Sequence, residues 1–284
     1  NKPLNEKVSK KTEDISARIM SNLGRLTVAN SKKIVFLFVL AFGVGIYGLI
    51  NITVNENRIG VFNKNEPIYK ADNLINLKLN GSNNLDIVIE TPETEDLFKP
   101  ENLLAIEKLQ EYVESLPMVG GVVSVVDYIK QMNKALNEGD NSYYKIPDDQ
   151  DLIAQLFLLY SLSGDPTDFE EEIDYEYRTA NIRVNIKSGM YLDHGIILDQ
   201  LNQYISNEFN KNGERKATLS GRVEVNHTWV SKIGESHFNS VAFALCLVFL
   251  MASLVFGSFS AGFLALLPVM VSIMIIYAVM VFNN

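Results

Sequence analysis

The chain has 284 residues, of which 47% are apolar, and a formal net charge of −9 at pH 7. Residues 1–33 carry eight Lys or Arg against three acids, residues 55–238 carry 17 against 31, and the last 46 residues carry no formal charge. An acidic middle without a basic stripe argues against a nucleic-acid-binding protein. The single cysteine, Cys246, excludes an intrachain disulfide and leaves the cellular compartment open.

Residues 1–33 are a polar, basic leader before the first apolar run. Within residues 12–28, apolar side chains recur at spacings of three and four, which is typical of a short amphipathic helix. We expect a cytoplasmic helix that leads into the first span. A helix that lies on the membrane surface and binds lipid is the alternative.

Residues 34–54 predict the first transmembrane helix, because about 20 apolar residues span a bilayer. The run is longer than the apolar part of a signal peptide, and no small-x-small cleavage site follows it. We therefore expect a retained helix. Lys32 and Lys33 flank its start, so the positive-inside rule predicts a cytoplasmic N-terminus.

Three small residues of this span predict how it packs. Ala41, Gly45 and Gly48 fall on one face of a helix, and Gly43 is nearby. Small side chains let two helices approach closely in a membrane. We expect this face to pack against another helix of the same bundle, with a dimer motif as the alternative.

Residues 55–238 are predicted to form one extracytoplasmic α+β domain. Alternating β-branched residues predict strands, and apolar spacings of three and four predict helices. The expected order is a strand over 85–90, a helix over 100–116, a strand over 119–126, helices over 128–137 and 148–161, a strand over 179–187, a helix over 192–210 and a strand over 217–220. Asp148 or Asp149 is the expected N-cap of the helix over 148–161. Two such strand-helix-strand units usually make a ferredoxin-like (split βαβ) sandwich.

Residues 239–282 contain no Asp, Glu, Lys, Arg or His. They predict two more transmembrane helices, over 239–256 and 263–282, joined by a cytoplasmic turn over 257–262. We expect the chain after Gly221 to run as one helix into the first of these spans. The predicted fold class is a membrane protein, with an α-helical bundle part of three spans and one extracytoplasmic domain.

Pro268 lies inside the last span and predicts a kink, because proline removes a backbone hydrogen bond from a helix. Packing and gating stay open as roles for this kink. A proton-coupled transporter needs an ionisable group inside the membrane, and the polar side chains of the last two spans are not ionisable there. We therefore expect no proton-relay residue in this chain.

No motif in the chain predicts catalysis, and we expect a protein that is not an enzyme. His194, His227 and His237 lack the spacing of a metal site on one helix face, so structural or solvated roles are expected. The acidic run over 168–174 lacks the pattern of an EF-hand loop and is expected to be a solvated loop. The Gly120-Gly121 pair has no following Lys-Ser/Thr of a phosphate-binding loop. No metal or cofactor is expected.

Several short strings keep an order and spacing typical of one family. They are residues 81–90, 116–124, 152–160 with 163–166, 220–221, 254–262 and 266–268. Together they cover about residues 34–282. They resemble the N-terminal part of an exporter of the RND superfamily, in the MMPL-like branch of hydrophobe and amphiphile efflux proteins related to hopanoid and lipid exporters.

The resemblance implies a proton-driven exporter of lipids or other amphiphiles in a bacterial inner (cytoplasmic) membrane, with no cofactor. The implied partners are membrane lipids, an amphiphilic substrate and the remainder of the same polypeptide, with a homo-oligomer as a further arrangement. The chain begins with Asn rather than Met. We expect it to be a piece of a longer protein whose downstream part carries further spans, a second porter domain and the proton-relay residues.

Two alternatives stay open. The first is a membrane sensor or receptor with an extracytoplasmic ligand-binding domain. The second is an RND-related accessory subunit for protein translocation.

Overall fold

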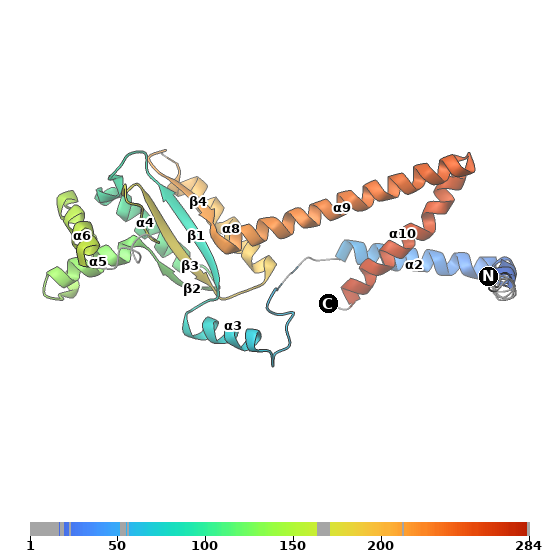
Figure 1. The fold of residues 1–284 in the computed structure, drawn as a ribbon, viewed down its shortest axis with the longest axis horizontal. Coiled ribbons are helices and arrows are strands. Elements are labelled where there is room, and N and C mark those ends of the chain that lie inside the picture. The colour runs from blue at the N-terminus through green and yellow to red at the C-terminus, as the bar shows by residue number, and fades with distance from the viewer. Residues whose placement is uncertain are drawn as a thin grey trace, which may run out of the picture. The chain divides into compact units, whose positions relative to one another are not determined.

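The computed structural model describes residues 17, 20–22, 24–51, 55, 57–163, 171–211 and 213–282. The chain divides into two compact units, one made of Asn1–Thr53 and Ser236–Asn284 and the other of Val54–Glu235. Figure 1 labels the elements of both. Several predicted features lie partly outside the described residues, namely the leader helix over 12–28, the end of the first span at 52–54 and the first part of the acidic run over 168–174.

The Val54–Glu235 unit contains a four-stranded antiparallel sheet (Figure 1). Its strands are β1 (Asn83–Glu90), β2 (Val119–Val123), β3 (Thr179–Ile186) and β4 (Lys216–Ser220), in the order β2-β3-β1-β4 across the sheet. β1 pairs antiparallel with β3 and β4, and β2 pairs antiparallel with β3. β1 and β2 therefore run in the same direction with β3 between them, and β3 and β4 do so with β1 between them.

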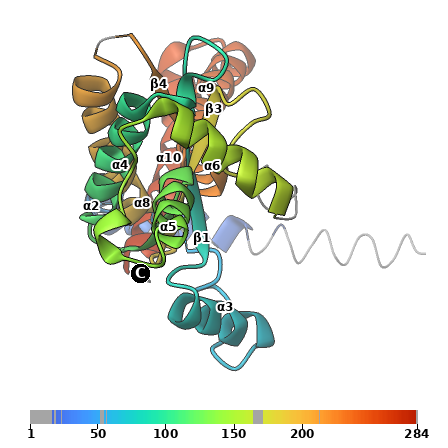
Figure 2. The same cartoon turned by 90° about the vertical axis from the view of Figure 1, so that its left-hand side faces the viewer.

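One face of this sheet lies in the core. Along β3, Ile182, Val184 and Ile186 are fully buried and alternate with half-buried polar residues, which confirms the predicted pattern of that strand. The face is covered by α4 (Pro100–Glu114) and α8 (Tyr191–Tyr204), which lie on the same side of the sheet in Figure 2. The rings of Tyr112 and Tyr204 stack with their centroids 4.0 Å apart, so the two helices lie side by side.

The remaining helices of this unit precede β1, as α3 does, or lie between the strands along the chain. They are α3 (Pro67–Lys78), η1 (Asp96–Phe98), α5 (Val125–Leu136), η2 (Asn141–Tyr143), α6 (Gln150–Ser163) and the π-helix η3 (Ile205–Phe209), which prolongs α8. Asp149, one of the two predicted caps, precedes α6, and its carboxylate accepts a hydrogen bond from the backbone N–H of Asp151 (3.0 Å). The sequence did not predict α3, which has no buried residue.

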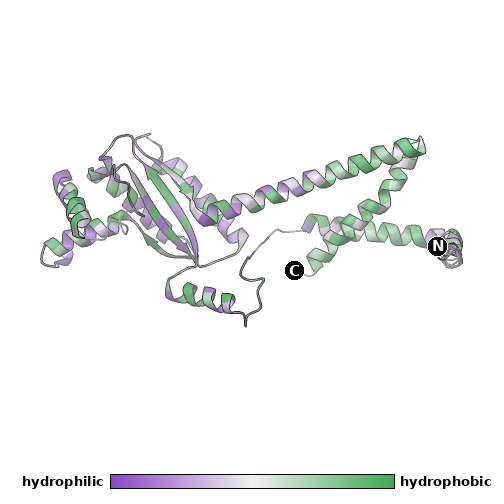
Figure 3. Cartoon of the chain, in the orientation of Figure 1, coloured by the Kyte–Doolittle hydropathy of each residue, from purple (hydrophilic) through white to green (hydrophobic). Residues whose placement is uncertain are grey.

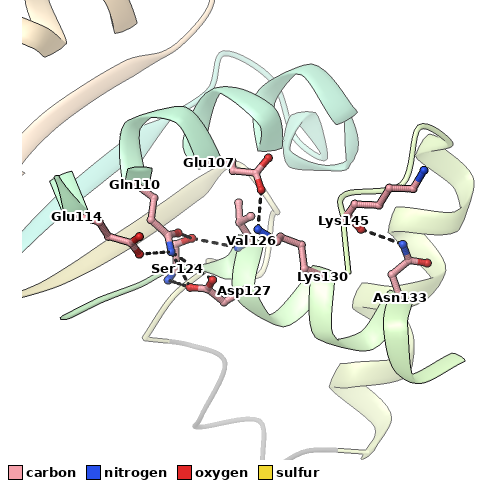
Figure 4. A network of polar contacts seen from close by, with 9 residues as sticks. All are labelled: Glu107, Gln110, Glu114, Ser124, Val126, Asp127, Lys130, Asn133 and Lys145. Carbon is pink, nitrogen blue, oxygen red and sulfur yellow. Dashed lines mark hydrogen bonds and ion pairs between the residues drawn. The ribbon is translucent and has the colours of Figure 1, made fainter. Parts of the chain in front are cut away.

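β2 ends at Val123, so the predicted strand over 119–126 is wrong in its last residues. α5 begins at Val125, before the predicted helix over 128–137. The Oγ of Ser124 accepts a hydrogen bond from the N–H of Val126 (3.2 Å), and the carboxylate of Asp127 accepts one from the N–H of Ser124 (3.1 Å). This capping box (Figure 4) starts a helix where two valines alone favour a strand.

Three helices are long and apolar enough to cross a membrane, namely α2 (Ser31–Asn51), α9 (Gly221–Phe256) and α10 (Phe259–Phe282). Figure 3 shows their apolar residues in green. Most of their large apolar side chains are exposed, as expected of helices that face lipid rather than a protein core. The predicted membrane association is confirmed at this level. α2 contains Lys32 and Lys33 in its first turn, whereas the predicted span began after them.

The turn between α9 and α10 is shorter than predicted. Only Gly257 and Ser258 separate the helices, so residues 259–262 of the expected turn over 257–262 belong to α10. Gly257 has φ +62°, its N–H bonds to the carbonyl of Leu254, and the N–H of Ser258 bonds to the carbonyl of Ser253 (3.1 Å). This is a Schellman cap, which ends a helix at a left-handed glycine.

Candidate functional site

Two glycines of the predicted small-residue face lie against α10. A Cβ on Gly45 would be 2.3 Å from the Cβ of Met274, and one on Gly48 would be 2.4 Å from the Cα of Ala278. A Cβ on Gly43 would meet nothing within 4 Å. Ala41 is half-buried. The structure therefore places Gly45 and Gly48 at a helix contact within one chain, where a larger residue has no room.

Pro268 lies within α10, which continues on both sides of it. The Oγ of Ser272 donates a hydrogen bond to the carbonyl of Pro268 (2.8 Å). The kink at this residue stays a prediction.

His237 and Tyr277 join α9 to α10. The Nε2 of His237 and the hydroxyl of Tyr277 are 3.0 Å apart, and Tyr277 is buried. For His237 we expected a structural or solvated role, and the sequence did not predict this partner.

His194 is the most buried of the three histidines, with 3% of its surface exposed. Its Nε2 is 2.7 Å from the carbonyl oxygen of Ser188, which can only accept, so Nε2 carries a proton and donates. Its Nδ1 is buried and has no hydrogen-bond partner in the described part of the chain. Burial lowers the pKa of His194 below its ordinary value of 6.5, although the Ser188 carbonyl favours the charged ring. The neutral ring leaves Nδ1 as an acceptor.

His194 lines a polar cavity of about 190 Å³ within the Val54–Glu235 unit. The wall is formed by residues 57–60, one face of α3, the start of β1, the residues after β3, α8 and the first turns of α9. Asn226 on α9 also lines it, and its Oδ1 is another buried atom that finds no partner among the residues described.

Asparagine side chains hold the walls of this cavity together. The Oδ1 of Asn57 accepts from the N–H of Gly60 (2.9 Å) and closes the turn over 57–60. The Oδ1 of Asn76 on α3 accepts from the N–H of Ser82 (3.0 Å), and the Nδ2 of Asn83 donates to the carbonyl of Ser188 (3.1 Å). Of these bonds, the one from Ser82 to Asn76 links α3, which has no buried residue, to the residue directly before β1.

The described residues of the cavity wall carry more positive than negative charge. Among them, Arg58, Lys187 and Arg222 are cationic, and Asp72 is the one carboxylate. The guanidinium of Arg58 lies 5.3 Å from the ring centroid of Trp229, and Asp72 accepts a hydrogen bond from Asn76. Among the described residues, neither Lys187 nor Arg222 forms an ion pair. Such a wall suits a small anion.

The last part of the acidic run has a structural role. Arg183 on the polar face of β3 forms ion pairs with Glu171 and with Glu172, the latter at 3.2 Å. Glu172 is 3% exposed, so the expectation of a solvated loop is wrong at this residue. The Asp174 carboxylate accepts hydrogen bonds from the N–H groups of Arg178 and Thr179, both at 2.8 Å.

No group of three His, Cys, Asp or Glu side chains that could hold a metal ion occurs in the part of the chain that the structure describes. No protein-family model matches the chain, and a comparison with curated proteins gives no significant match. The cavity escaped sequence reasoning because its wall joins positions between 57 and 226 that no local pattern connects.

Proposed function

We propose that the chain is the N-terminal part of a proton-driven, RND-like exporter of lipids or other amphiphiles. The observation that carries this proposal is the path of the chain after β4. Gly221 follows that strand directly and begins α9, a helix of 36 residues that holds a candidate span, and α10 follows after two residues. A folded domain is thus inserted between two candidate spans, and a third span follows without a cytoplasmic module.

The sheet supports the same proposal. The order β2-β3-β1-β4 with antiparallel neighbours is the arrangement of two interleaved βαβ units, so we infer a ferredoxin-like, porter-type domain. In this proposal the domain is extracytoplasmic, the N-terminus is cytoplasmic, and the membrane is the bacterial inner membrane. The proton-relay groups belong to the remainder of the same polypeptide.

A sensor or receptor fits the structure less well. Such a protein needs a cytoplasmic linker after its second span, and the two residues Gly257 and Ser258 leave no place for one. The phenotype of a deletion strain distinguishes an exporter from a translocation accessory with the same arrangement of spans. A deletion strain of an exporter accumulates a lipid, whereas a deletion strain of the accessory accumulates unprocessed secretory protein.

The test is transport by the complete gene product in proteoliposomes. We expect a fluorescent lipid analogue to move across the membrane when a pH gradient is imposed, and an ionophore that collapses the gradient to stop it. Gly48→Leu, which places a side chain against Ala278, should abolish transport, whereas Gly43→Leu on the same helix should not. Movement that ignores the gradient, or no movement of any amphiphile, would contradict the proposal.

A further inference from the structure

The polar cavity beside His194 has the features of a ligand site. We propose that it binds a small phosphate ester that carries a free hydroxyl group, either as a free metabolite or as the headgroup of a lipid. This inference uses only residues of the Val54–Glu235 unit and does not rest on the proposed function.

The cationic residues of the wall favour an anionic ligand. Lys187 and Arg222 line the cavity and form no ion pair among the described residues, and Arg58 adds a third cation. Asp72 is the one carboxylate among the described residues of the wall. Guanidinium and ammonium groups together match the oxygens of a phosphate, which accept several charge-assisted hydrogen bonds.

Two buried hydrogen-bond acceptors favour a ligand that also carries a hydroxyl group. His194 and Asn226 line the cavity, and the Nδ1 of His194 and the Oδ1 of Asn226 have no hydrogen-bond partner among the described residues, so each needs a donor. A bare phosphate has few hydrogens to offer, whereas a neighbouring hydroxyl group supplies them. A ligand that carries both phosphate oxygens and a hydroxyl group therefore provides acceptors for the cations and a donor for these two atoms.

The size of the cavity limits the ligand. Its volume of about 190 Å³ lies below the roughly 300–1,000 Å³ of pockets that hold drug-sized molecules. A glycerol phosphate group is of suitable size, whereas acyl chains would have to lie outside.

Trp229 provides the readout. It is the only tryptophan of the chain, and Arg58 on the cavity wall lies over its ring. Titration of the full chain in detergent with glycerol 3-phosphate should change the Trp229 emission in a saturable way, and calorimetry measures the affinity independently. Phosphatidylglycerol in nanodiscs is the second arm, which identifies a headgroup as the source if it binds and the free ester does not.

Variants locate the binding. Arg222→Gln and Lys187→Gln, both at exposed positions, should each weaken binding about tenfold or more, because each removes a charge-assisted hydrogen bond. Lys232→Gln is the matched control, since it removes a cation from the same helix as Arg222 and lies outside the cavity wall. Methyl phosphate, which has the charge but no hydroxyl, should bind about tenfold more weakly than glycerol 3-phosphate.

Three results would overturn the proposal. They are no saturable binding in either arm, an equal loss of affinity in Lys232→Gln, and equal affinity for methyl phosphate and glycerol 3-phosphate. The last result would remove the role given to His194 and Asn226 and with it the assigned ligand class.

Discussion

His194 shows what burial does to a single titratable residue. Its ring is enclosed, its Nε2–H is fixed on the Ser188 carbonyl, and its pKa is lowered from 6.5, mainly by desolvation. The unfolded chain therefore binds a proton at a higher pH than the folded chain does. Between pH 6.5 and the lower folded-state pKa, protonation favours unfolding.

We predict that this histidine makes stability fall as the pH drops through about 6.5. His194→Gln should flatten that part of the pH dependence, even if it lowers stability at every pH by removing the bond to Ser188. The measurement is the midpoint of denaturant unfolding of both proteins in detergent between pH 5 and 8. Parallel curves for the two proteins would show that His194 does not bind fewer protons when folded.

At the scale of elements, the start of α5 is fixed by a polar network (Figure 4). The Oγ of Ser124 donates to the Oε1 of Gln110 on α4 (2.5 Å) while it accepts from the N–H of Val126. The Nε2 of Gln110 in turn donates to the Asp127 carboxylate (3.0 Å). Ser124 is fully buried, so each of these groups depends on the others for its partners.

Ser124→Ala should lower the free energy of unfolding by about 1–3 kcal/mol, because it removes an N-cap and leaves Gln110 with an unpaired buried oxygen. Ser115→Ala is the control, since Ser115 is exposed and follows α4 without a partner in this network. Denaturant unfolding measures both. A similar small loss in the two variants would mean that the network contributes little to stability.

The elements also show which patterns the sequence could predict. β3 alternates buried and half-buried residues, and α10 is a continuous apolar run, so both were recognised. Val125 and Val126 have a high strand propensity, and the capping box formed by Ser124 and Asp127 is what favours a helix here. α3 has no buried stripe for a pattern to reveal, and its Asn76 accepts a hydrogen bond from Ser82 directly before β1.

Some features of the helix contact and of the cavity could be predicted from the sequence, and others could not. Gly45 and Gly48 could be predicted, since small residues on one helix face have a local signature. Which helix they meet could not, because Met274 and Ala278 lie more than 200 positions further along the chain. The buried Nδ1 of His194 depends on packing from several elements, which the residues around it do not encode.

At the scale of the whole molecule, the proposed orientation is open to a labelling experiment. Cys246→Ser removes the only cysteine, after which single cysteines at Lys64, an exposed position of the Val54–Glu235 unit, and at Ser21 in the leader report on the two sides. We predict that a membrane-impermeant maleimide labels Lys64→Cys in intact spheroplasts and labels Ser21→Cys only after permeabilisation. The reverse pattern would place the domain in the cytoplasm.

The turn at Gly257 and Ser258 constrains how the chain enters the membrane during synthesis. Two residues reach at most about 7 Å, whereas the hydrocarbon core is about 30 Å thick. When both helices span the bilayer, the adjoining ends of α9 and α10 must therefore lie on the same side of it. The two helices can then insert as one hairpin. When a substitution makes one helix less apolar, the apolar surface of the other helix still favours insertion of the pair.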